Sequence, residues 1–334
     1  MAGIARGKII YGDSSGDPAV LTVGSNGQAL VSDGTDISWG SAGASTVNGL
    51  TDAIVDITNF VDGLLIQTDS DGSAPTTGTL STATGNTGIG KGVFTALTSG
   101  DHNTGIGYGV LAALTTGSTN VAIGKECLDA NTTGGSNVAI GGGALGANTT
   151  AGSNVAIGGN SMLLNTTGTT NVGIGANDGA LMDNTTGSYN VAIGGSALEN
   201  NTTASHNVAI GGQAMQTCTT GFDSVGIGWE ALEAMTTAQQ NTSVGMNSSK
   251  LTTSGSYNTV VGTYAFYDNT TGASNTAVGS SVLAANTTGY NNTAVGKNSM
   301  GANTTGAENA AFGINSLSLN TTASNNTALG KGVM

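Results

Sequence analysis

Charge is scarce in this sequence, and most of it has one sign. Charged residues are 8% of the 334 positions, with 20 acidic side chains against seven basic ones, and the formal net charge is −13. So acidic a chain repels a phosphate backbone, which argues against nucleic acid as a partner. Aromatic residues make up 4% of the chain, and it has two prolines. This is not the composition of ordinary globular domains.

Long apolar runs are also missing. No stretch reaches the roughly 18 apolar residues that a membrane helix needs. The opening residues, MAGIARGKIIYGDSSGDPAV, lack the apolar core of a secretory signal. We therefore expect no membrane insertion and no export by the general secretory route.

What the sequence has in abundance is glycine, 56 residues, most of it within a repeat. The phrase NVAIG at Asn137 returns at Asn154, and fifteen copies follow one another at intervals of 17 residues, with one interval of 19. We number the copies as coils 1 to 15 and the places within each copy as positions 1 to 17. The coils begin at residues 86, 103, 120, 137, 154, 171, 190, 207, 224, 241, 258, 275, 292, 309 and 326.

The columns of this alignment assign a role to each position. Position 1 is Asn except at Ser224, position 5 is always Gly, and position 13 is Thr in every completed coil. Position 4 is apolar, position 9 is large and apolar except at Ser249, and positions 3 and 8 are small. Seventeen residues are too few for the two helices of a helical solenoid. We therefore predict two short strands per coil, one around Val-Ala-Ile and one around Ala-Leu.

The fold class that follows is all-β: a parallel β-solenoid of about 15 coils. At the strand spacing of about 4.8 Å, these coils form a rod of about 70 Å. Stacking places Asn on Asn and Thr on Thr, so that their side chains can hydrogen-bond along the rod. Glycine at position 5 allows a positive φ or a close backbone approach at a corner. Examples of these structural positions are Asn137, Gly141, Thr149, Asn154, Gly158 and Thr166.

The core of one coil is thin. Two large apolar side chains, at positions 4 and 9, contribute roughly 3–6 kcal/mol when buried, against roughly 17–34 kcal/mol of backbone entropy for seventeen residues. Small residues at position 3 would let another chain approach closely. We therefore expect an oligomer.

The segment at residues 45–67 suggests which oligomer forms. Its apolar residues follow a 3-4-3-4-3 spacing, which predicts a short trimeric coiled-coil neck with Ser45 as N-cap. An ordinary amphipathic helix or a strand stays open, because Gly49 and Gly63 weaken helix propensity. The expected core positions are Val47, Leu50, Ile54, Ile57, Val61 and Leu64.

The remaining segments complete the expected organisation. Residues 1–44 contain alternating apolar and polar residues with Gly, Asp and Asn turns, which predicts a small β segment for attachment. Residues 68–85 have the composition of a linker. Residues 86–334 are the β-solenoid shaft.

Two resemblances bear on function. The phrase N-V-A-I-G-x-x-A-L resembles the repeat of trimeric autotransporter adhesin heads, which implies a left-handed β-roll of three chains. The longer form N-T-x-x-G-x-x-A-L-x-x-N-T-T-G resembles repeats in tail fibres and related virion fibres of marine and cyanobacterial phages. GQALVSDGTDISWG at residues 27–40 and STVNGLTDAIVDIT at residues 45–58 are also similar to phage fibre sequences.

The resemblance implies a structural, non-enzymatic, homotrimeric tail fibre of a bacteriophage virion that contributes to host attachment. Without an export signal or a membrane anchor, a bacterial trimeric surface adhesin is the less favoured interpretation, and a capsid-decorating head fibre or spacer stays open. The expected partners are further copies of the chain and, through the N-terminus, a tail, baseplate or capsid protein. A host surface glycan or another fibre protein could bind at the C-terminus.

Motifs for catalysis or cofactor binding are weak here. The glycines around Lys91 form a corner of the repeat, without the Ser or Thr and the helix of a phosphate loop. Cys127 and Cys218 lie five coils apart, about 24 Å, too far for a disulfide. Asp69 and Asp71 lack the downstream Glu of a calcium loop. We therefore expect neither a cofactor nor a metal site.

Exposed aromatics and breaks in the repeat are the remaining candidates for binding. Aromatic side chains on a turn edge can stack on sugars or dock a partner. We expect such an edge at Tyr189, Phe222, Tyr257 and Tyr290. The repeat breaks at Asn177-Asp178, Ser224, Ser249 and Met334, where function is expected to concentrate.

Overall fold

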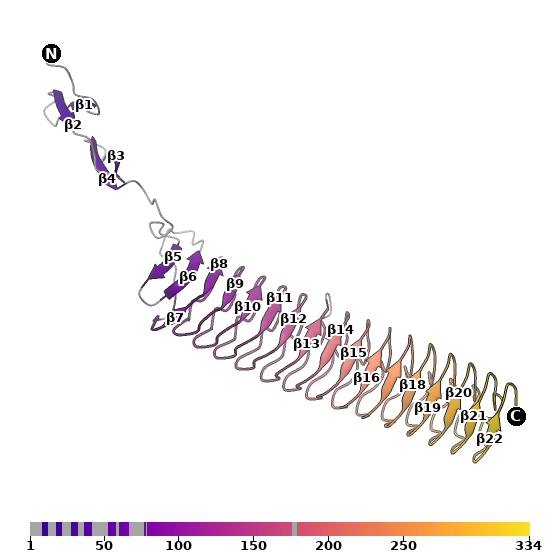
Figure 1. Cartoon of the computed structure of the whole chain (residues 1–334). Coiled ribbons are helices and arrows are strands. Elements are labelled where there is room, and N and C mark those ends of the chain that lie inside the picture. The colour runs from indigo at the N-terminus through magenta and orange to yellow at the C-terminus, as the bar shows by residue number, and fades with distance from the viewer. Residues whose placement is uncertain are drawn as a thin grey trace.

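The main body of the protein is a rod of stacked coils (Figure 1). The computed structural model describes residues 9–12, 18–21, 28–32, 37–41, 53–57, 60–66, 77, 79–175 and 179–334, and no helix occurs among them. The predicted parallel β-solenoid with a 17-residue spacing is confirmed. Its fifteen strands are β8 (Thr87–Ile89), β9 (Thr104–Ile106), β10 (Val121–Ile123), β11 (Val138–Ile140), β12 (Val155–Ile157), β13 (Val172–Ile174), β14 (Val191–Ile193), β15 (Val208–Ile210), β16 (Val225–Ile227), β17 (Thr242–Val244), β18 (Thr259–Val261), β19 (Thr276–Val278), β20 (Thr293–Val295), β21 (Ala310–Phe312) and β22 (Thr327–Leu329).

Each shaft strand pairs in parallel with the strands of the neighbouring coils. Ala122 of β10 lies opposite Ala139 of β11, seventeen residues later. In the one longer repeat, Gly173 lies opposite Ala192, so the strand register continues across the two extra residues. The two extra residues therefore do not shift the pairing of β13 with β14, and residues 176–178 themselves lie outside the described part of the chain.

Glycine at position 5 follows every shaft strand, and at nearly all of these positions it is required for two reasons. Gly141 has φ of +128°, a region that side chains strongly disfavour. A Cβ added to it would lie 2.5 Å from the carbonyl carbon of Gly158 in the next coil. The column therefore needs both the dihedral freedom and the small size of glycine.

The predicted second strand of each coil is wrong. Positions 6 to 11 form turns, and the apolar residue at position 9 has left-handed dihedrals, with φ of 49° at Leu128 and 54° at Leu145. A strand needs negative φ, so this residue cannot belong to one. Both side chains are nevertheless fully buried. Each coil thus has one strand and a compact turn that inserts position 9 into the core.

The assignment of positions 3 and 4 is also reversed. In β10, Ala122 at position 3 is fully buried, whereas Ile123 at position 4 is 37% exposed. Position 3 faces the interior of its own coil. Its residue is small because the buried turn leaves little space there. Beside Met162 the next coil has Gly173, where an added Cβ would lie 2.9 Å from the Met162 Cγ. The large β-branched residues at position 4 lie on the outer face of the sheet.

The N-terminal side of the first coil is covered by a hairpin rather than by a coiled coil. Strands β5 (Ala53–Ile57) and β6 (Phe60–Ile66) pair antiparallel, and β6 continues in parallel into β8, with Leu65 opposite Gly88. Strand β7 (Ala83–Thr84) also pairs with β6.

The coiled-coil prediction is therefore wrong over residues 53–57 and 60–66. β-branched and aromatic residues favour strands, and Gly63 weakens a helix. Of the expected core positions, Val47 and Leu50 lie outside the described residues. The other four, Ile54, Ile57, Val61 and Leu64, lie on the two strands.

The first 44 residues contain two antiparallel hairpins. Strand β1 (Ile9–Gly12) pairs with β2 (Pro18–Leu21), and β3 (Gln28–Ser32) pairs with β4 (Ile37–Ser41). The alternating pattern of this segment thus corresponds to strands. Most of the expected linker at residues 68–85 lies outside the described residues.

Candidate functional site

A continuous column of buried hydrogen bonds runs along position 1. The backbone N–H of Asn137 donates to the Oδ1 of Asn120 at 3.0 Å, and its Nδ2 donates to the same oxygen at 3.1 Å. The Nδ2 also donates to the carbonyl of Ala151, in the same coil, at 2.9 Å. Each asparagine side chain thus bonds to a neighbouring coil and also to a carbonyl at the end of its own coil. Position 1 is therefore the main polar link along the rod.

The break at Ser224 does not interrupt this column. The N–H of Ser224 donates to the Oδ1 of Asn207 at 3.0 Å, and its Oγ accepts the N–H of Asn241 at 3.2 Å. A hydroxyl therefore replaces the amide as acceptor, and the structure assigns no separate binding role to this residue.

Threonine at position 13 forms a second column with the opposite polarity. The Oγ1 of Thr132 donates to the carbonyl of Thr149 in the following coil at 3.0 Å, and Thr149 contacts Thr166 in the same way at 3.5 Å. The asparagine amides donate toward the preceding coil, whereas these hydroxyls donate toward the next one. The two ends of the rod therefore present different hydrogen-bonding groups.

Sequence reasoning missed a second asparagine ladder at position 12. The Nδ2 of Asn148 donates to the Oδ1 of Asn131 at 3.1 Å, and later coils repeat the contact. The ladder is interrupted in coils 8 and 9, where position 12 holds Cys218 and Met235. It resumes at coil 10, where the Oγ1 of Thr252 accepts the Nδ2 of Asn269 at 3.1 Å. The buried Oδ1 of Asn201, at the last step before this gap, has no hydrogen-bond partner. The Asn of the recurrent Asn-Thr-Thr triplet is the sequence feature that could have predicted this ladder.

The outer face of the shaft sheet has no charge. Positions 2 and 4 of all fifteen coils point outward there and hold only Val, Thr, Ala, Ile, Phe or Leu. We call these two columns the sheet face. Its exposed members include Ile89, Ile106, Val261 and Phe312, at 37–41%. The charged residues of the described coils lie at positions 6, 7, 10, 11, 16 and 17 instead.

The turns at positions 6 to 11 form a mixed surface, where charged residues lie among exposed apolar ones such as Trp229, Leu164 and Leu319. Gly143 and Gly146 leave a hollow of about 320 Å³ between Glu126 and Asp129 on one side and Leu163 and Leu164 on the other. Burial raises the pKa of the Asp129 carboxyl, and repulsion from Glu126 raises it further.

The four predicted contact aromatics are exposed on one edge but are not brought together. Tyr189, Phe222, Tyr257 and Tyr290 are 42–56% exposed and occupy coils 6, 8, 10 and 12, so about 9.6 Å separates successive coils that carry one. Tyr189 stacks on His206 of the next coil, with ring centroids 5.2 Å apart and planes 9° apart. Because stacked rings turn their faces along the rod, Tyr189 offers mainly its edge to a ligand lying beside it.

Coil 10, residues 241–257, has a polar interior. Ser243, Ser248 and Ser249 replace the usual small and apolar core residues. The Ser243 Oγ is hydrogen-bonded to the Ser248 Oγ at 2.8 Å and to the Ser249 Oγ at 3.0 Å, as donor in one contact and acceptor in the other. The buried Oδ1 of Asn247 has no partner. The apolar core is consequently divided into two clusters, one ending at Ala238 and the other beginning at Val260. Ser249, singled out in the sequence, lies at this division.

An ion pair joins coils 9 and 10 at the division. The Lys250 Nζ contacts the carboxylates of Glu230 and Glu233, the latter at 3.1 Å. The hydrogen bond to Glu230 and the neighbouring charges raise the pKa of Lys250 to about 12.

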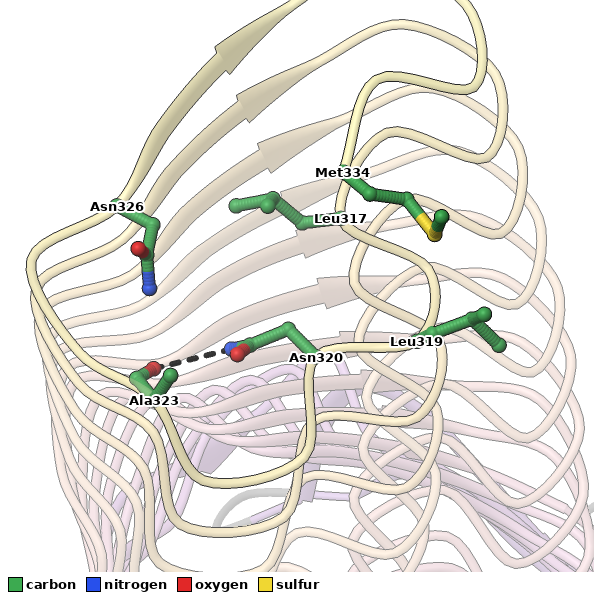
Figure 2. Close-up of a pocket in the computed structure, with 6 residues that line it drawn as sticks. All are labelled: Leu317, Leu319, Asn320, Ala323, Asn326 and Met334. Carbon is green, nitrogen blue, oxygen red and sulfur yellow. Dashed lines mark hydrogen bonds between the residues drawn. The ribbon is translucent and has the colours of Figure 1, made fainter.

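A hollow of about 260 Å³ lies at the last coils of the shaft (Figure 2). Asn320 donates its Nδ2 to the carbonyl of Ala323 at 3.0 Å, as the inner asparagines do within their coils. The hollow therefore continues the interior of the preceding coils. It is lined by Leu317, Leu319, Asn320, Ala323, Asn326 and Met334.

The two cysteines are buried free thiols. Burial raises the pKa of Cys218 to about 12 and also raises that of Cys127. Thiols with raised pKa are poor nucleophiles. Within the described part of the chain, no three or more His, Cys, Asp or Glu side chains gather at a possible metal site, and no helix could cross a membrane. Asn177, Asp178, Asp69 and Asp71 lie outside that part.

No known family matches this chain. Family models, curated proteins and solved structures were all compared with it without a significant match. Function is therefore inferred from the sequence and from the surfaces described above.

Proposed function

We propose that the protein is the structural shaft of a homotrimeric bacteriophage virion fibre, a tail fibre that contributes to host attachment without catalysing a reaction. The observation that carries the proposal is the continuous uncharged sheet face along a regular rod. Apolar rows of this length normally mark a contact with another protein. Further copies of this chain fit best, because they share its 17-residue period.

The proposed role is mechanical. Two-way hydrogen bonding between all coils suits a stiff spacer, since every coil is fixed by both neighbours. With the sheet faces turned toward one another in the trimer, the turns and the aromatic edge remain outside. The N-terminal hairpins are the proposed attachment to a tail, baseplate or capsid protein. A host surface glycan or another fibre protein is the proposed partner farther along the shaft.

Two measurements test this function. Light scattering of the purified protein should give three times the chain mass of 32.4 kDa. Antibody labelling of virions should place the chain on the tail, and soluble protein should compete with virions for adsorption to host cells. A monomeric mass would exclude the trimer. Labelling of the capsid with unchanged adsorption would favour a head fibre or spacer, and labelling of a bacterial surface would favour an adhesin.

A further inference from the structure

We infer that the turn surface of coils 7 to 11 binds a neutral glycan, with a sugar ring stacked on the indole of Trp229 and its hydroxyls bound by neighbouring amides and carboxylates. The inference rests on the attachment role proposed above, and it names a surface and a ligand chemistry for that role. This surface lies on the turns at positions 6 to 10. It is separate from the predicted edge at Tyr189, Phe222, Tyr257 and Tyr290.

Trp229 lies against the rod. It occupies position 6 of coil 9, two residues after β16 (Figure 1), and is 54% exposed. A Cβ added to Gly212, at position 6 of the preceding coil, would lie 2.5 Å from its Cζ3 and 2.8 Å from its Cε3. The indole therefore covers the place where a side chain of coil 8 would stand. With one side on the glycine backbone, the ring offers its other side to solvent as a platform.

Hydrogen-bonding side chains border this platform toward the N-terminal coils. Gln213 directly follows the covered glycine, and its Nε2 donates to the Oε1 of Gln216 at 3.5 Å. The Nε2 of Gln216 in turn donates to the Oε2 of Glu199, in coil 7, at 2.7 Å. All three residues are partly exposed. A carboxylate accepts at about four sites and an amide both donates and accepts, so these groups retain capacity for the hydroxyls of a ligand.

A second polar group borders the platform toward the C-terminal coils. Glu230 directly follows Trp229, and together with Glu233 it contacts the Nζ of Lys250. The ion pairs hold these side chains beside the indole. The border thus contains ammonium and amide donors as well as carboxylate acceptors, which suits a hydroxyl because it both donates and accepts.

Charge and polarity together select the ligand class. The two polar groups contain three glutamates and one lysine, and the whole chain has a net charge of −13, so an anionic polymer is repelled. An apolar partner would bury the carboxylates without supplying hydrogen bonds, which costs free energy. A neutral pyranose ring meets both demands. Its C–H face packs on the aromatic ring, and its rim of hydroxyls faces the border.

The coil spacing suits an extended glycan lying along the rod. Tyr264, at position 7 of coil 11, is 44% exposed and lies two coils beyond Trp229, about 9.6 Å along the axis. One coil is close to the length of one pyranose ring with its glycosidic oxygen, so successive sugars would lie over successive coils. We therefore expect a trisaccharide or longer chain to bind more tightly than a monosaccharide.

Affinity electrophoresis of the full chain tests the site. Native gels that contain dextran, a mannan or a galactan measure binding as retardation of the protein, and at least one of these three neutral polysaccharides should retard it. Trp229→Ala should weaken binding by at least about tenfold through the lost stacking contact, and Trp229→Phe should retain part of it. Gln213→Ala should also weaken binding, because it removes one hydrogen-bonding group.

Tyr108→Ala is the matched control. Tyr108 also occupies position 6 and is also 54% exposed, but Gly109 and Ala112 stand at positions 7 and 10 of its coil, where coil 8 has its two glutamines. Without a polar border, this aromatic residue should not contribute, and Tyr108→Ala should leave the retardation unchanged. All variants should keep the melting temperature of the unaltered protein in circular dichroism.

The outcomes separate this inference from the proposed function. No retardation by any of the three polysaccharides, or stronger retardation by the anionic polygalacturonate, would refute a neutral glycan as the ligand. Equal losses in Trp229→Ala and Tyr108→Ala would refute the site. A trimeric tail protein that binds no neutral polysaccharide would keep the fibre and lose this inference. A monomer that is retarded through Trp229 would keep the site and lose the trimeric fibre.

Discussion

Coils 1 to 9 and coils 11 to 14 have the same 17-residue architecture but different residues, and coil 10 lies between them. The first region has Ile at position 4 and an apolar core ending at Ala238, whereas the second has mostly Val at position 4 and a core beginning at Val260. The hydrogen-bonded columns at positions 1 and 13 nevertheless pass through coil 10 without a gap. Continuity of this shaft thus depends on its polar columns more than on a continuous apolar core.

The strongest test transplants the polar interior of coil 10 into coil 4. The triple variant Ala139→Ser, Ala144→Ser and Leu145→Ser copies Ser243, Ser248 and Ser249. We expect unfolding free energy to fall by about 4 kcal/mol, mainly from the lost leucine and the cavity it leaves. Urea unfolding followed by circular dichroism measures the change.

A compensated variant sharpens the same comparison. In coil 11, Val260 and Phe266 are larger than the usual residues at positions 3 and 9 and lie next to the serines of coil 10. Adding Ala156→Val and Met162→Phe to the transplant should recover at least half of the loss. If these two substitutions destabilise the transplant further, volume compensation does not explain how coil 10 is tolerated.

The second prediction concerns the unbroken column at position 1. Asn154→Ala leaves the N–H of Asn171 without its acceptor, which lies at 2.9 Å. It also removes one of the two donors to the carbonyl of Gly168, which keeps the Nδ2 of Asn165 at 3.0 Å. An unsatisfied buried group costs about 1–3 kcal/mol, so we expect a loss of about 2 kcal/mol. Asn154→Ser, which places at coil 5 the residue that coil 9 has at Ser224, is the control and should cost about 1 kcal/mol. If Asn154→Ala and Asn154→Ser lower the melting temperature equally, the result would contradict the role of the residue 154 side chain as a hydrogen-bond acceptor.

The third prediction uses pH to probe the gap in the position 12 ladder. The buried thiol of Cys218 has its pKa raised from 9.0 to about 12. The unfolded chain therefore releases this proton first, and stability is lost as pH rises from about 9 toward 12. Stability at pH 10 should be about 1.4 kcal/mol lower than at pH 8 from this group. Cys218→Asn should remove this contribution, and an unchanged pH slope would refute it.

The smallest expected effect comes from the ion pair beside coil 10. Lys250→Met removes the contact with Glu230 and Glu233, and we expect a loss of at most about 1 kcal/mol because such pairs near the surface are well solvated. The loss should shrink in 1 M salt, where the Debye length is about 3 Å. Lys125→Met, at an exposed pair with Glu126, is the control and should have no measurable effect.

Periodicity predicted the solenoid because identical columns can satisfy their amides and hydroxyls only by stacking. It did not reveal the path within a coil. Leucine at position 9 suggested a strand, and its left-handed dihedral has no signal in residue type. The burial of positions 3 and 4 was predicted the wrong way round, because the large β-branched residues at position 4 suggested burial. The turn at positions 6 to 11 fills the interior instead, and only a small residue at position 3 fits beside it. Local spacing at Ile54 and Ile57 matched a heptad, but pairing with the first coil makes this segment a hairpin.

The opposite directions of the asparagine and threonine columns have a consequence for how the rod is made. The amide of each new coil donates to an oxygen of the coil translated just before it, as Asn154 does to Asn137. The acceptors are therefore already in place when the next seventeen residues leave the ribosome, and the β5–β6 hairpin is the first template. Growth of the shaft can keep pace with its synthesis, one coil at a time, without waiting for a distant part of the chain.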